Sequence, residues 1–161
     1  MKHLLFLMLL THVLGFSQNS DLNFDPEKVG QIKLYRFNKS NFCDQSKGLS
    51  IIYNNKLSPC FDYLKSLDKN RSKSIIKLLL SKKSYGEPFM VTFDTDYAIT
   101  VYDNVDKLIG WINFSQQFQS SRSTPRIEVQ EIQTNGPIKK DGLVKKSRKK
   151  LIKLLDIDSS K

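Results

Sequence analysis

Histidine is nearly absent from this chain, and its scarcity excludes several kinds of catalytic site. The 161 residues include two histidines, His3 and His12, both at the very start of the sequence. Histidine is the usual base for a serine or cysteine nucleophile and the commonest protein ligand of transition metals. If the first seventeen residues are removed during export, histidine triads and ordinary zinc sites are therefore excluded from the mature protein.

Long hydrophobic runs are also absent, apart from one at the N-terminus. Leu4 to Leu14 form an apolar segment that follows Lys2 and precedes the small residues Gly15 and Ser17. This arrangement is typical of a signal peptide and predicts cleavage near Ser17. The run is too short to span a bilayer, which takes about 20 apolar residues. No later stretch qualifies, so we expect a secreted or periplasmic protein whose mature form has no integral membrane span.

Cysteine occurs only at Cys43 and Cys60. An even number of cysteines in an exported chain indicates a disulfide, and two cysteines allow a single pairing. No CxxC redox pair is present. An oxidised pair also leaves no thiolate to act as a nucleophile. We therefore expect a structural Cys43–Cys60 disulfide.

Acidic residues are fewer than basic ones, at 16 against 26, and the formal net charge is +10. Such an excess favours contact with phosphate, sulfated sugars or acidic headgroups, although a basic protein can also be merely soluble. Eight of the fifteen residues from Lys139 to Lys153 are basic. The candidate residues for binding an anionic partner are Lys145, Lys146, Arg148, Lys149, Lys150 and Lys153. On a helix most of these lysines repel each other at i,i+3 and i,i+4 spacing. A solvated helix face and a docking face for an acidic protein are the alternatives.

Two groups of carboxylates are the only other candidates for a chemical site. Asp94 and Asp96 lie at one end of an expected strand, and Asp103 and Asp106 lie at the other. Paired carboxylates could bind Ca²⁺ or divide acid and base roles. The strand would keep the two pairs about 20 Å apart, and aspartate is common in turns for local reasons. We therefore expect no catalytic residues, no metal and no cofactor.

Hydrophobic periodicity divides the rest of the chain into expected elements. Period-two alternation predicts strands at 31–37, 49–53, 89–93, 97–101, 108–114 and 127–132. Helical spacing predicts helices at 64–83, with Ser66 or Asp68 as the cap, and at 143–157. Gly110, inside a strand, indicates a bulge or a close backbone approach. The Gln/Ser-rich stretch 115–126 has no period and is expected to be an exposed loop.

This order of elements predicts an α+β fold, an antiparallel meander of about four strands with two helices on one face, the last of them C-terminal and basic. The expected organisation is a signal peptide at 1–17, a mobile segment at 18–28, a single domain at 29–157 and a disordered tail at 158–161.

Three segments carry a resemblance to known proteins: Ser84-Tyr85-Gly86, the hairpin from Val101-Tyr102-Asp103 to Gly110, and the helix from Gly142 to Leu155. These segments occur in an order that resembles small uncharacterised exported bacterial proteins, and the resemblance covers the chain from about Leu67 to Leu155. Those proteins often have cysteines after the hairpin unit, where this chain has Ser115, Gln116 and Gln117. The resemblance implies export and no particular activity.

Three hypotheses about function follow. The first is an exported, non-enzymatic interaction module whose basic C-terminal helix contacts an anionic partner or surface. The second is an inhibitor or immunity-type protein that binds another exported protein through a strand edge or the Gln/Ser-rich loop. The third and least favoured is a carboxylate-dependent hydrolase. Binding that depends strongly on salt would favour the first hypothesis, and a salt-tolerant protein complex would favour the second.

Overall fold

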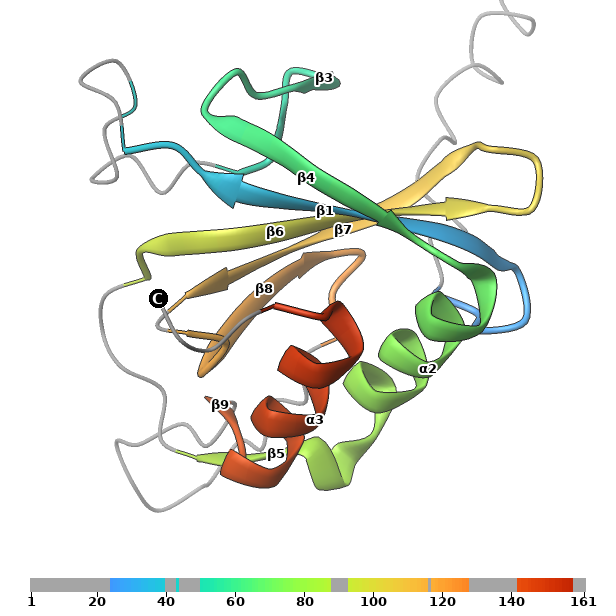
Figure 1. Cartoon of the computed structure of the whole chain (residues 1–161), viewed down its shortest axis with the longest axis vertical. Helices are drawn as coiled ribbons and strands as arrows, with labels where there is room; N and C mark the ends of the chain where they lie inside the picture. Colours follow the sequence, from blue (N-terminus) through green and yellow to red (C-terminus); the bar gives the residue numbers. More distant parts are fainter. Residues whose placement is uncertain are drawn as a thin grey trace, which may run out of the picture.

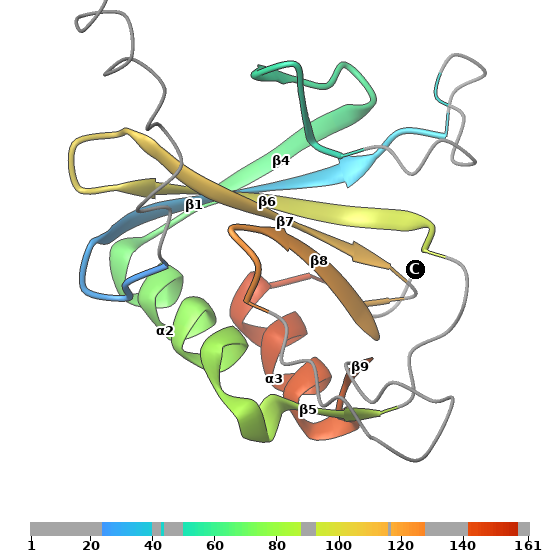
Figure 2. The same ribbon diagram turned by 180° about the vertical axis from the view of Figure 1, so that it is seen from behind.

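The computed structural model describes residues 24–39, 43, 50–87, 93–115, 117–127 and 142–157. A five-stranded antiparallel sheet lies against two helices that sit side by side on one of its faces (Figure 1 and Figure 2). The sheet contains, in spatial order, β4 (Phe61–Leu67), β1 (Val29–Phe37), β6 (Thr95–Asp103), β7 (Leu108–Ser115) and β8 (Ser120–Thr124). The helices are α2 (Lys69–Leu80) and α3 (Lys145–Leu155), and a 3₁₀ turn, η2 (Lys82–Ser84), follows α2.

Two small strand pairs complete the described part of the chain. β2 (Ile52–Tyr53) pairs with β3 (Lys56–Leu57) across a turn at Asn54 and Asn55. β5 (Tyr85–Glu87) pairs with β9 (Gly142–Leu143) and so brings the end of η2 to the start of α3. The α+β fold class, the antiparallel sheet and the C-terminal helix are therefore confirmed. The sheet differs from a simple meander because β1 lies inside it, between β4 and β6.

The first predicted helix is wrong at its N-terminal end. Residues 61–67 form the edge strand β4, and α2 begins only at Lys69. Leu64, where the predicted helix begins, lies on this strand and is 43% exposed. Asp68 is the N-cap, and its carboxylate accepts a hydrogen bond from the backbone N–H of Arg71 at 3.0 Å. The cap therefore ends the strand and starts the helix at the same residue.

The predicted Gln/Ser-rich loop is also wrong, because residues 120–124 form β8 and pair with β7 in regular register. Serine and threonine give no hydrophobic alternation, so this strand is invisible to a periodicity search. The strand predicted at 97–101 begins earlier, because β6 starts at Thr95 and includes Asp96. Most of the predicted strands 89–93 and 127–132 lies outside the described residues, whereas the other predicted strands appear as β1, β2, β6 and β7.

The main core lies between the helices and the sheet. Its helical side consists of fully buried residues, namely Ile75, Ile76 and Leu79 from α2 and Leu151 and Leu155 from α3. They pack against the sheet residues Ile32, Leu34, Ile99, Val101, Ile112 and Phe114. Phe24, which precedes β1 in the segment expected to be mobile, is 1% exposed and belongs to this core. The two helices are thus fixed to the sheet and to each other.

A smaller cluster lies on the opposite face of the sheet and includes the disulfide. Tyr35, Phe37, Ile51, Phe61 and Ala98 are buried there with Cys60. Cys43 and Cys60 form the expected disulfide, with their Cα atoms 5.6 Å apart. No helix in the described residues is long and apolar enough to cross a membrane.

Candidate anion-binding site

Helix α3 presents a narrow buried stripe and a broad basic surface. Its buried residues are Ser147, Leu151 and Leu155, which recur every four residues and so face the core together. The backbone N–H of Val144, the N-cap residue, donates to the carbonyl of Ser84 at 2.9 Å. At the other end Lys65 of β4 donates to both the carbonyl and the carboxylate of Asp156 and lowers the pKa of that carboxyl. Contacts at both ends therefore fix the position of α3.

The structure divides the six predicted binding residues into three groups. Lys146 and Lys150 flank the side of α3 that faces α2. Lys145, Lys149 and Lys153 are exposed on the side away from the buried stripe. Arg148 is half-buried on the third side, and its Nε is buried with no partner among the described residues.

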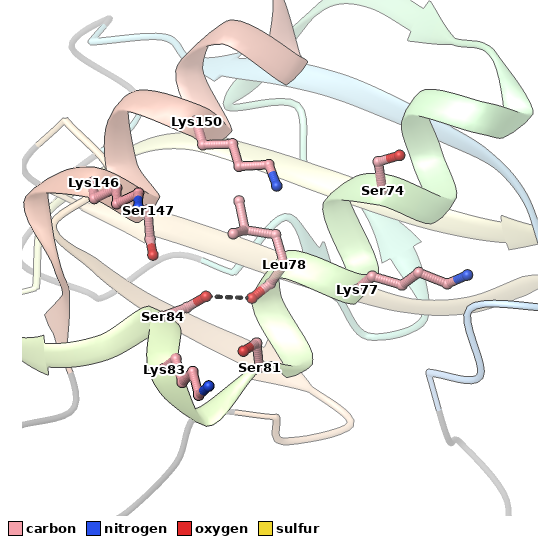
Figure 3. A pocket seen from close by; sticks show the side chains of 9 residues that line it. All are labelled: Ser74, Lys77, Leu78, Ser81, Lys83, Ser84, Lys146, Ser147 and Lys150. Carbon is pink, nitrogen blue, oxygen red and sulfur yellow. Dashed lines mark hydrogen bonds between the residues drawn. The ribbon is translucent and has the colours of Figure 1, made fainter.

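Lys146 and Lys150 form one wall of a pocket between α3 and the end of α2 (Figure 3). The cavity has a volume of about 590 Å³. Its lining residues are Ser74, Lys77, Leu78 and Ser81 from α2 and its C-cap, Lys83 and Ser84 from η2, and Lys146, Ser147 and Lys150 from α3. Four lysines and four serines thus surround one leucine, so the pocket is rich in hydrogen-bond donors.

The side-chain hydroxyls of two of the four serines have no hydrogen-bond partner among the described residues. Ser84 donates to the carbonyl of Leu78 at 2.6 Å, and Ser74 donates to the carbonyl of Asn70 at 2.8 Å. Ser147 and Ser81 make no such bond, although Ser147 is only 8% exposed. Figure 3 shows the Ser147 hydroxyl directed into the space between α3 and Ser84. The Ser147 hydroxyl is not one of the fully buried polar atoms that lack a partner, so it is accessible from the pocket and open to a ligand.

The positive charge of the pocket is only partly neutralised. Within the described residues, Lys83, Lys146 and Lys150 have no ion-pair partner. Lys77 points away from the pocket in Figure 3 and pairs with Glu27 at 3.0 Å. The first turn of α3 adds to the positive potential, because no side chain caps it and helix N-termini carry partial positive charge.

Glu27 is expected to titrate far below an ordinary glutamate. Hydrogen bonds from Lys73 and Lys77, and then the charges of both lysines, lower its pKa from 4.5 to about 2. A depressed pKa stabilises the fold above the unfolded-state value and loses this effect as pH falls from about 4.5 to 2. The carboxyl carbon shift of Glu27, followed by NMR, should change with a midpoint near pH 2 in the parent. A midpoint near 4.5 would contradict the pairing of Glu27 with Lys73 and Lys77.

Sequence reasoning located α3 but missed the second wall of the pocket. The lysines and serines between Leu67 and Lys83 fit the polar positions of the predicted helix, and Ser84 follows its end. Lys82 and Lys83, which directly follow the apolar stripe of the helix, are the one feature of the sequence that indicates a second basic segment. Their proximity to α3 depends on the β5–β9 pairing, which joins segments about sixty residues apart.

The carboxylate candidates are not brought together into a site. Asp103 accepts hydrogen bonds from the N–H groups of Val105 and Lys107, each at 2.9 Å, and so stabilises the turn between β6 and β7. Asp96 accepts from the N–H of Gln117 at 3.1 Å. The described residues contain no group of three or more histidine, cysteine or acidic side chains that could hold a metal ion.

No family model, curated protein or solved structure matches the chain. The resemblance to small exported bacterial proteins therefore stays a prediction, and any function has to be inferred from the residues themselves.

Proposed function

We propose that this protein is an exported, non-enzymatic interaction module that binds an anionic partner through the basic surface of α3 and the adjoining pocket. The observation that carries the proposal is the pocket itself, which lysines from η2 and α3 line without a carboxylate among its lining residues. Lys146 and Lys150 are one helical turn apart on α3, and like charges at that spacing cost stability in the free protein. A bound anion would offset that cost.

Several other features support the proposal without bearing on the identity of the partner. The disulfide is compatible with an oxidising compartment. The only two histidines of the chain lie in the predicted signal peptide, so catalysis by histidine would require the uncleaved form. Electrostatic attraction to a positive surface also speeds association with anionic partners.

The proposal predicts salt-dependent binding of a polyanion. With a short DNA duplex as the probe, a contact set of about four lysines should give a log–log salt slope of about −3 to −4. Changing Lys145, Lys146, Lys149 and Lys150 together to glutamine should remove most of this binding. Glutamine keeps the helix propensity high, so the variant should fold at least as well as the parent. Fluorescence anisotropy at several salt concentrations would measure both quantities.

A second fourfold variant controls for net charge. Lys28, Lys39, Lys56 and Lys69 are exposed and lie outside α3, so changing them to glutamine removes the same charge. We expect this control to keep most of the binding. Equal losses in the two variants, or no loss in the α3 variant, would overturn the proposed role of α3.

A protein partner is the second candidate, and exposed apolar residues favour it. Tyr53 and Leu57 on the β2–β3 hairpin, and Tyr63 and Leu64 on the edge strand β4, are 43–67% exposed. Edge strands can pair with another chain. A stoichiometric complex that tolerates high salt and depends on Tyr63 would favour this function over the first.

A further inference from the structure

We infer that the pocket between α2, η2 and α3 is a binding site for a phosphate monoester group, a doubly charged oxyanion at the end of a larger ligand. This inference rests on the proposed anionic partner and adds the chemical group that the partner presents. It separates the pocket from the outer surface of α3, which would attract any polyanion.

The lining groups of the pocket that have no partner among the described residues are hydrogen-bond donors. Lys83, Lys146 and Lys150 carry ammonium groups without an ion-pair partner in the described chain, and Ser81 and Ser147 carry free hydroxyls. Each of these groups can donate a hydrogen bond to an oxyanion. In Figure 3 the side chain of Lys150 reaches from α3 towards α2, and the Ser147 hydroxyl points towards η2. A ligand between the walls would therefore be contacted from both.

The charge of the site favours a monoester over a diester. Three unpaired ammonium groups exceed what a singly charged phosphodiester would neutralise, whereas a phosphate monoester carries about −1.5 to −2 at neutral pH. Hydrogen bonds between charged partners are about twice as strong as neutral ones. A dianion with three terminal oxygens thus uses more of the available donors than a diester does.

The size of the pocket indicates that the phosphate is part of a larger molecule. Its volume of about 590 Å³ exceeds that of a single phosphate group and falls within the range of about 300–1,000 Å³ typical of small-molecule sites. Leu78 is the one apolar residue of the lining. It offers a contact for the carbon atoms that follow the phosphate ester.

The fixed geometry of the walls also favours a specific site. The start of α3 is tied to η2 by the hydrogen bond from Val144 to Ser84 and by the pairing of Tyr85 with Leu143. Ser84 in turn donates to Leu78 of α2. The backbone of both walls is thus held in place before a ligand arrives, so only the lysine side chains have to be ordered on binding.

Two matched helix variants test the inference. Lys146→Gln/Lys150→Gln removes the two pocket lysines of α3, and Lys145→Gln/Lys149→Gln removes two outward lysines with the same spacing and charge. Titration calorimetry with glycerol 3-phosphate should give at least about a tenfold loss of affinity for the first pair and less than about threefold for the second. Ser147→Ala should cost about three- to tenfold through one lost hydrogen bond while keeping the charge unchanged. Thermal unfolding would verify that all three variants fold.

Dimethyl phosphate and the DNA duplex complete the experiment. The parent should bind dimethyl phosphate about tenfold or more weakly than glycerol 3-phosphate, because the diester carries one charge. Equal losses in the two helix variants, or equal affinity for the two phosphates, would overturn the pocket site. If the parent binds DNA but not glycerol 3-phosphate, the inference of a phosphate site is refuted and the proposed binding of an anionic partner stands. If the parent binds neither ligand, the phosphate site and the proposed function are both refuted.

Discussion

Replacing Gly110 with alanine is expected to lower the free energy of unfolding by about 3 kcal/mol. Gly110 lies in β7, where an added Cβ would be 2.5 Å from the ring of Phe24 and 2.5 Å from the carbonyl oxygen of Thr124. Phe24 is buried in the main core, and the carbonyl belongs to the neighbouring strand β8. Neither can move aside without disturbing the packing, so the cost lies at the upper end of the overpacking range.

Urea denaturation would measure this cost. Val105→Ala is a suitable control, because Val105 lies at the β6–β7 turn and is 81% exposed. We expect the control to change stability by less than about 0.5 kcal/mol. If Gly110→Ala unfolds at the same urea concentration as the parent, Phe24 does not pack against β7 as the structure has it.

Removing the disulfide is expected to cost a similar amount. Cys43 and Cys60 are 17 residues apart in the sequence, and closing a loop of that length stabilises a fold by about 3 kcal/mol in the chain-entropy model. Cys60 is also buried beside Phe37 and Phe61, so its loss disturbs the second cluster. The helices lie on the other face of the sheet, and binding by α3 should be unaffected as long as the protein is folded.

The double variant Cys43→Ala/Cys60→Ala provides the measurement. Its unfolding midpoint should be lower than that of the parent and should not respond to a reducing agent. The reduced parent should approach the midpoint of the variant. A parent whose stability is the same with and without reductant would contradict the structural role of this bond.

The fold could be predicted from the sequence where apolar residues alternate visibly. β1, β6, β7 and α3 all follow from such patterns, and Gly110 marks both a bulge in the β6–β7 pairing and a close approach. β8 consists of serine, arginine and threonine, so nothing in its own sequence distinguishes it from a loop. The helix predicted at 64–83 takes in the second half of β4, because Leu67 continues the apolar spacing of the following helix. This segment is a strand because it pairs with β1, which lies about thirty residues earlier in the chain.

The site could be predicted only in part, for a related reason. The charge density of α3 is a local property and is visible in the sequence. The orientation of Lys146 and Lys150 towards α2, and of Lys145 and Lys149 towards solvent, depends on which face Leu151 and Leu155 bury. Lys83 lies beside α3 because β5 pairs with β9. Lys77 points away from the pocket because it pairs with Glu27, fifty residues earlier in the chain. A local pattern cannot encode either contact.

The most direct test of the account is a residue-resolved NMR titration of the protein with glycerol 3-phosphate. The account predicts that backbone amide shifts concentrate on η2 and the first turn of α3, around Lys83, Ser84, Lys146 and Ser147. They should saturate with a single affinity. Small shifts spread evenly over exposed lysines such as Lys28 and Lys56, with no saturation, would contradict a phosphate site in this pocket.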